Sequence, residues 1–163
     1  MQDKMQIEKV EIVCFAVVCA VTMFISANPY AIGAYNGCQW YQHFTYQFFH
    51  ASAFHLGANI YVMWLCTTRF NLKQWQLLVC LIISMLAPPI FTMPTIGASG
   101  IVYAMLGMIN TMVLEKLRFA SWIALYITIS AFLNCNWVIH LLCFILGFIT
   151  NYTVDLWKRL KTL

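Results

Sequence analysis

Two side chains in this sequence, the hydroxyl of Ser99 and the imidazole of His140, have the chemistry of a nucleophile and its base. Ser99 lies in the run Gly97-Ala98-Ser99-Gly100, which opens an apolar segment. Backbone N–H groups at the start of a helix are free to hold the oxyanion that forms when a carbonyl is attacked. A lone serine between glycines is more often a helix cap or a packing site. The nucleophile hypothesis therefore depends on His140, which can accept a serine proton near neutral pH.

Four further polar residues have a spacing that can support this chemistry. Tyr103 follows Ser99 by one helical turn, so its ring can pack on the imidazole and hold it in place. His55 and Asn59 share a helical face, where they can donate to an oxyanion or, equally, form an interhelical polar clamp. His50 is turned roughly 140° away from His55 on a regular helix, which predicts a structural role at the helix entrance.

No carboxylate is placed to orient the imidazole. Glu115 is about 24 Å from Ser99 along a helix, and Asp155 is about 22 Å from His140. A serine mechanism would therefore use a Ser–His dyad. The sequence also lacks the two intramembrane carboxylates of an aspartyl protease and the His-Glu-x-x-His motif of a zinc protease. We accordingly expect no metal and no cofactor.

The composition indicates a chain that is dissolved in a bilayer. Of the 163 residues, 63% are hydrophobic and 9% are charged, whereas a soluble domain carries about a quarter charged residues. The net charge of +4 is the balance of nine Lys and Arg against five Asp and Glu, and the basic residues form no dense run. Such residues are typical of membrane topology signals, so we expect no nucleic-acid partner.

Six apolar segments are candidates for membrane helices, because spanning about 30 Å of hydrocarbon takes roughly 20 residues. We expect the third segment to stop or kink at Pro88-Pro89, since proline removes backbone hydrogen bonds. The predicted fold class is all-α, a six-helix polytopic bundle that forms a single membrane domain, 1–163. The predicted segments are about 10–27, 46–66, 74–91, 99–114, 119–133 and 138–157.

The basic residues predict the orientation of this bundle. With six spans they all fall on one side, and the opposite loops at about 28–45, 92–98 and 134–137 contain none. The positive-inside rule makes the charged side cytoplasmic, with both chain ends inside. Ser99 and His140 then lie near the extracytoplasmic face of a multi-pass protein, which we expect in a bacterial cytoplasmic membrane. The basic residues are Lys4, Lys9, Arg69, Lys73, Lys116, Arg118, Lys158, Arg159 and Lys161.

The seven cysteines cannot all pair within one chain. Most lie in apolar runs and are interpreted as small buried side chains. Cys38 and Cys135 fall in predicted loops on the same side of the membrane. A bridge between these two and a pair of free thiols both remain open.

These motifs together resemble the rhomboid family of intramembrane serine proteases, in its minimal six-helix form. The run from His50 to Asn59 resembles the family's His-x4-His-x3-Asn, and Gly97-Ala98-Ser99-Gly100 resembles its Gly-x-Ser-Gly. A Tyr four residues after the Ser, and a His followed by Gly147 in the last segment, are similar as well. Order, spacing and side of the membrane agree, so the joint pattern is specific although each motif is weak.

The resemblance implies roles for these residues. Ser99 would be the nucleophile and His140 the base, with Tyr103 and Gly97 in support. The oxyanion hole would consist of His55, Asn59 and the backbone N–H of Ser99. The loop at 28–45 would lie partly in the outer leaflet, and the segment at 119–133 would be the mobile wall near which a substrate helix enters.

Two departures from the family pattern concern packing. Trp40-Tyr41-Gln42 stands near the place where many members have Trp-Arg, without the Arg. Cys143 occupies a position that often has a smaller residue, yet Cys143 and Gly147 still form a small-x3-small pair that allows a close approach to the segment containing Ser99.

Three functions fit the sequence in decreasing order. The first is an intramembrane serine endopeptidase whose partners are transmembrane protein substrates and membrane lipid. The second is a catalytically inactive rhomboid-like protein that binds transmembrane helices. The third is a small transporter, for which the inner halves of the segments offer few polar residues beyond Asn110 and Thr111. The oligomeric state stays open.

Overall fold

The computed structural model describes residues 2–132 and 135–162, with side chains from Val10 onward. Within these ranges the chain forms eight helices and no strand. Six of the helices are long, and two short ones follow α1. The elements are α1 (Gln2–Thr22), α2 (Pro29–Ile32), α3 (Gln42–Thr45), α4 (Ala53–Phe70), α5 (Gln74–Leu86), α6 (Ser99–Asn110), α7 (Lys116–Phe132) and α8 (Trp137–Leu160).

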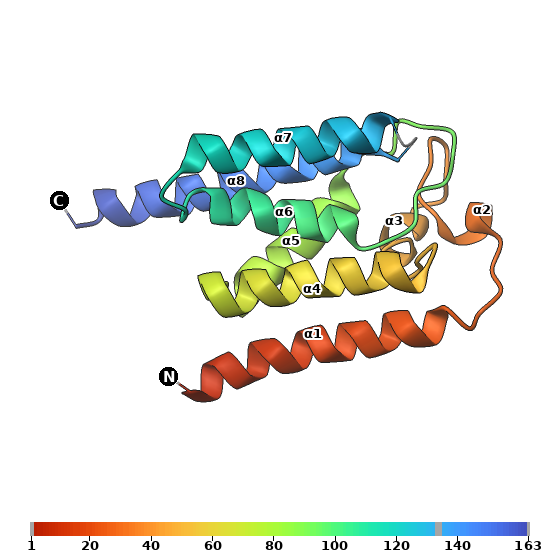
Figure 1. Ribbon diagram of the computed structural model, residues 1–163, viewed down its shortest axis with the longest axis horizontal. Coiled ribbons are helices and arrows are strands. Elements are labelled where there is room, and N and C mark those ends of the chain that lie inside the picture. The colour runs from red at the N-terminus through yellow and green to blue at the C-terminus, as the bar shows by residue number, and fades with distance from the viewer. Residues whose placement is uncertain (1, 133–134, 163) are drawn as a thin grey trace.

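The central element is α6, which contacts α4, α5, α7 and α8. Its residues are the most consistently buried in the molecule, from Gly100 to Asn110. Figure 1 shows that α6 and α8 both begin at the end of the molecule where α2 and α3 lie. The start of α1 and the end of α8 lie at the opposite end (Figure 1).

The close contact between α6 and α8 requires a glycine on each helix, Gly107 on α6 and Gly147 on α8. A Cβ added to Gly147 would lie 2.1 Å from the carbonyl oxygen of Ala104, and one on Gly107 would lie 2.1 Å from that of Phe144. Cys143, one turn before Gly147, is fully buried. The predicted close approach through this small-residue pair is therefore confirmed, and it brings the first turns of α6 and α8 together.

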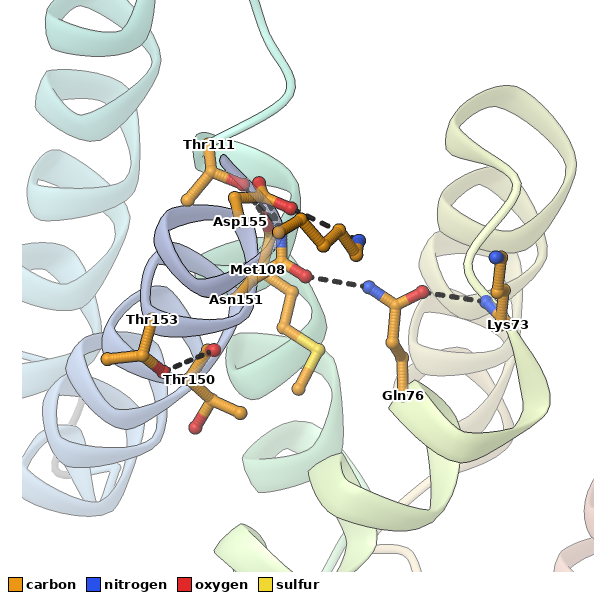
Figure 2. Close-up of polar contacts among 9 residues, drawn as sticks. Lys73, Gln76, Met108, Thr111, Thr150, Asn151, Thr153 and Asp155 are labelled. Carbon is orange, nitrogen blue, oxygen red and sulfur yellow. Dashed lines mark hydrogen bonds and ion pairs between the residues drawn. The ribbon is translucent and has the colours of Figure 1, made fainter. Parts of the chain in front are cut away.

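At the far end of the same helices, a buried polar cluster joins α5, α6 and α8 (Figure 2). Gln76 Nε2 donates to Asn151 Oδ1 at 2.9 Å, and Asn151 Nδ2 donates to Thr111 Oγ1 at 2.5 Å. The side-chain oxygen of Gln76, Oε1, accepts from the backbone N–H of Lys73 at 2.9 Å. We call Gln76, Asn151 and Thr111 the distal cluster. Its hydrogen bonds hold the three helices together, and Asn151 Nδ2 also lies 3.5 Å from Asp155 Oδ2.

The segment between α1 and α4 is folded against the connection from α5 to α6. Ala34 and Thr95 exchange two backbone hydrogen bonds of 3.0 and 2.9 Å. Gln42 is 1% exposed and its Nε2 donates to the carbonyls of Tyr30 and Gly33 at 2.8 and 2.9 Å. A buried glutamine thus organises this loop through its side-chain hydrogen bonds.

Each predicted apolar segment contains a helix, but several boundaries differ. The second was expected from 46, whereas α4 begins at Ala53, because the Ser52 hydroxyl accepts from the His55 N–H at 3.1 Å and caps the helix there. The third was expected to reach 91, but α5 ends at Leu86, just before Pro88-Pro89. The fifth was expected at 119–133, and residue 133 lies outside the described ranges.

The first and fourth helices also end earlier in the sequence than expected. The first was predicted to extend to 27, but α1 ends at Thr22, whose hydroxyl bonds to the carbonyls of Cys19 and Phe48 at 2.8 and 2.7 Å. The fourth was predicted to extend to 114, but α6 ends at Asn110, and the Thr111 side chain is engaged in the distal cluster.

The outer surface is typical of contact with lipid. Large apolar side chains are exposed along the helices, including Val17, Phe54 and Leu125. Among the described helices, α8 is the one that is long and apolar enough to cross a bilayer, while Val10–Thr22, α5 and α6 are apolar but shorter. The cysteines within the described ranges form no disulfide, so the bridge between Cys38 and Cys135 is not formed.

Candidate active site

Ser99 and His140 meet at the end of the bundle that is remote from the distal cluster. Ser99 is the first residue of α6, and His140 lies in the first turn of α8. The distance from His140 Nε2 to Ser99 Oγ is 2.9 Å, which is a hydrogen bond. Asn136 fixes the start of α8, since its side chain accepts from the backbone N–H of Ile139 at 3.3 Å. The predicted spatial meeting of the two side chains is therefore present.

Tyr103 lies against the imidazole. The ring centroids of Tyr103 and His140 are 4.3 Å apart with an angle of 19° between the planes, so the rings are stacked. The His140 side chain is 7% exposed. Packing on one face and the hydrogen bond to Ser99 together fix the plane of the imidazole.

Gly97 and His55 form one wall of the site. Gly97 has a φ of +124°, a conformation that side chains rarely adopt, and its N–H donates to the Tyr46 carbonyl at 2.8 Å. A Cβ at this position would lie 2.5 Å from Cε1 of His55. The glycine is therefore required both by the backbone and by the ring that lies against it.

His50 lies at the entrance to the helix that carries His55, as the sequence predicted. Only the start of that helix differs from the expected segment, since α4 begins at Ala53 and His50 lies in the turn that leads into it. Its Nε2 accepts from the Ala98 N–H at 3.2 Å, and its Nδ1 lies 3.4 Å from the Phe48 carbonyl. The ring thus connects the segment before α4 to the residue before Ser99, which is a structural role.

Asn59 carries a buried donor that has no hydrogen-bond partner among the described residues. It is 7% exposed and lies one turn after His55 on α4. Its Nδ2 makes no hydrogen bond to any described residue. Leaving a buried donor unpaired costs about 1–3 kcal/mol, so such groups are rare outside functional sites.

A cavity of about 570 Å³ adjoins the pair. Ser99, His55 and His140 line it, together with residues 91–96 and the start of α8. Its volume is within the range of ligand-binding pockets, about 300–1,000 Å³. Asn136 Nδ2 donates to Thr95 Oγ1 at 2.8 Å and so ties the two covering segments to each other. Asn59, one turn after His55 on α4, is not among the residues that line this cavity.

Sequence reasoning missed one polar neighbour of His140. Ser130 Oγ, near the end of α7, lies 3.4 Å from His140 Nδ1. A lone serine in an apolar helix carries no distinguishing signal. Its position ten residues before His140, at the same end of the neighbouring helix, could have indicated the contact.

The arrangement defines an all-helical protein in which a recessed serine and an imidazole are paired beside a cavity. Comparison with protein families gives a match of residues 37–157 to the Rhomboid domain. The match covers most of the chain and includes every candidate site residue, so the chain belongs to the rhomboid family. This family consists generally of intramembrane serine proteases, and membership indicates an integral membrane protein. No curated protein matches the chain.

Proposed function

We propose that this chain is an intramembrane serine endopeptidase that cuts transmembrane segments of other proteins by a Ser–His dyad. The observation that carries the proposal is the 2.9 Å hydrogen bond between Ser99 Oγ and His140 Nε2, at the wall of a cavity. An inactive rhomboid-like binder has no need for this pair to meet. Membership of a family of proteases adds to the case.

The proposed reaction follows from this geometry. Ser99 Oγ attacks the substrate carbonyl while His140 Nε2 takes its proton. The oxyanion accepts hydrogen bonds from His55, from Asn59 Nδ2, which has no partner among the described residues, and from the backbone N–H of Ser99 at the first residue of α6. His140 then gives the proton to the leaving amine, and the C–N bond breaks. Water then attacks the acyl-enzyme while His140 takes its proton. His140 returns a proton to Ser99 Oγ as the ester bond breaks.

The substrate must expose its peptide bond before it can be cut. In a transmembrane helix every backbone group is hydrogen-bonded within the helix. We propose that the substrate unwinds near its outer end and that helix-breaking and small residues near the cut are favoured. The cavity beside Ser99 would accept the unwound segment.

The lengths of the helices support a site below the membrane surface. We propose that α1 and α4 to α8 are six spans of a single membrane domain, 1–163. The 24 residues of α8 reach about 36 Å, whereas the 12 residues of α6 reach about 18 Å. Hydrocarbon about 30 Å thick thus exceeds the length of α6. Ser99, at its first residue, would be recessed, with water reaching it through the cavity.

The charges support an orientation with both chain ends inside. The basic side chains of the described ranges lie at the ends of α4 and α8, just before α5 and at the start of α7, which is the end of the bundle remote from Ser99 (Figure 1). Under the positive-inside rule this end is cytoplasmic, and the site lies towards the extracytoplasmic face. We propose a bacterial cytoplasmic membrane as the location. These basic side chains are Arg69, Lys73, Lys116, Arg118, Lys158, Arg159 and Lys161.

Cleavage in liposomes tests the proposal. The purified chain is reconstituted with a model transmembrane substrate and compared with the Ser99→Ala and His140→Ala variants. We expect cleavage by the wild type alone, together with labelling of Ser99 by a fluorophosphonate. A wild type that binds the substrate but neither cuts it nor reacts with the probe would identify an inactive binder instead.

A further inference from the structure

Ser130 places a second hydroxyl at the other nitrogen of the catalytic imidazole. Its Oγ lies 3.4 Å from His140 Nδ1 and 2.7 Å from the carbonyl oxygen of Ile127, one turn earlier on α7. Ser130 is partly buried at the point where α7 passes the first turn of α8. The imidazole is thus held between two hydroxyls, Ser99 at Nε2 and Ser130 at Nδ1.

The distances decide which atom carries each proton. A hydroxyl has one proton and two lone pairs, and a backbone carbonyl can only accept. The short contact therefore assigns the Ser130 proton to the Ile127 carbonyl. The lone pairs of Ser130 Oγ then face Nδ1, so a hydrogen bond there requires that Nδ1 carry the proton.

A neutral imidazole has a single N–H, so a proton on Nδ1 leaves Nε2 free to accept. This is the tautomer that can take the proton of Ser99. In the other tautomer Nε2 would donate to Ser99 and could not serve as its base. Stacking on Tyr103 fixes the plane of the ring, but both tautomers stack equally well. The choice of tautomer needs a partner at Nδ1.

The geometry points to Ser130 as a positioning residue that selects the Nδ1–H tautomer of His140, in the place where a carboxylate would stand in a triad. The inference rests on the proposed Ser–His mechanism. No proton passes to Ser130: His140 gains its second proton from Ser99 at Nε2 and returns it to the leaving amine. The Ser130 hydroxyl holds Nδ1–H throughout and stabilises the imidazolium by its dipole.

The expected size of the effect is modest. A neutral acceptor is weaker than a carboxylate, and 3.4 Å is longer than the usual hydrogen bond. A net hydrogen bond of this class corresponds to about a three- to tenfold change in rate. Because the contact joins α7 to α8, movement of α7 would also release the imidazole.

Ser121 provides a matched control on the same helix. Its hydroxyl bonds back to the Leu117 carbonyl at 2.9 Å, as that of Ser130 does to Ile127, but Ser121 is exposed at the other end of α7. Ser130→Ala and Ser121→Ala therefore remove the same atom from the same kind of helix contact. Ser130→Thr keeps the hydroxyl and its bond to the preceding turn.

The test measures the tautomer directly and the kinetics separately. The protein is labelled with ¹⁵N-histidine in detergent micelles, and the His140 signals are assigned by their loss in His140→Asn. We expect the Nδ1–H tautomer in the wild type, in Ser121→Ala and in Ser130→Thr, and a mixture of tautomers in Ser130→Ala. Cleavage by Ser130→Ala should show a kcat about three- to tenfold lower with unchanged KM, and Ser130→Thr should restore it.

The outcomes separate this inference from the proposed function. A tautomer population in Ser130→Ala equal to that of the wild type would overturn the role of Ser130, whatever the chain cleaves. Equal loss of kcat in Ser121→Ala would overturn it as well. Absence of cleavage by the wild type would overturn the proposed function, while the NMR signals would still decide which nitrogen of His140 carries the proton.

Discussion

The two ends of the α6–α8 pair carry polar clusters that differ in whether their buried amides have hydrogen-bond partners. In the distal cluster the amides of Gln76 and Asn151 are 4% and 2% exposed, and they are hydrogen-bonded to each other and to their neighbours (Figure 2). At the other end Asn59 is 7% exposed, and its Nδ2 has no partner among the described residues. A satisfied network stabilises the packing of helices, whereas an unsatisfied donor destabilises the free protein and is available to a ligand.

An unpaired atom does not identify a site by itself. Asn110 Oδ1, next to the distal cluster in sequence, is also buried without a partner in the described ranges. Asn59 differs from it because Asn59 lies one turn from His55, which lines the cavity beside Ser99. From this comparison we propose a stabilising role for the distal cluster and a catalytic role for the cluster beside Ser99, and variants at each end can test it.

The largest effect is expected at the pair itself. Ser99→Ala and His140→Ala should each lower kcat by about a millionfold, which is below detection, because nucleophile and base act as a unit. The double variant should be no worse than either single one. Liposome cleavage measures the rate, and thermal unfolding in detergent should show that all three variants are folded. Substantial residual cleavage by Ser99→Ala would remove Ser99 from the mechanism.

The next largest loss of activity is expected on removal of the Asn59 side-chain amide. Asn59→Ala should lower kcat by about 10²–10³-fold, the usual loss for one donor to an oxyanion. Because Nδ2 makes no hydrogen bond to a described residue, and an unpaired buried donor costs about 1–3 kcal/mol, the free energy of unfolding should not fall. Cleavage kinetics and thermal unfolding measured on the same preparation check both parts. A large loss of stability with an unchanged kcat would make Asn59 a structural residue and would end the comparison.

The sequence predicted which side chains meet at the candidate site better than it predicted the local folding. The motif around Ser99 and the spacing of Tyr103 predicted that both side chains meet His140. Helical periodicity places Ser99 and Tyr103 on one face of α6, and the absence of a side chain at Gly147 lets α8 approach that helix closely. The turns before α4 were missed, since a run of apolar and aromatic residues has no periodicity that separates a turn from a helix. Ser130 was missed because its contact joins two helices and leaves no local pattern.

A substitution at Gly97 tests whether the contact with the His55 ring matters for activity, and Gly37 provides the matched control. Gly97→Ala should lower kcat about 10- to 100-fold, because its Cβ would lie 2.5 Å from the His55 ring and a displacement near 1 Å can cost a hundredfold. Gly37 also has a positive φ, +87°, but a Cβ there would meet nothing within 4 Å. Gly37→Ala should therefore share the backbone strain of Gly97→Ala without its loss of activity. Equal loss of kcat in both variants would attribute the effect to strain alone.

The last prediction concerns the distal cluster, where stability should change and chemistry should not. Asn151→Ala removes the partner of Gln76 and of Thr111, and it should lower the free energy of unfolding by about 2–4 kcal/mol. Thr150→Ala is the control, since that hydroxyl bonds back to the Leu146 carbonyl at 2.8 Å and lies outside the cluster (Figure 2). Per folded molecule, kcat should be unchanged in both variants, because Asn151 lies about 16 Å along α8 from His140. A lower kcat in folded Asn151→Ala would show instead that the two ends are coupled through the packing of α6 on α8.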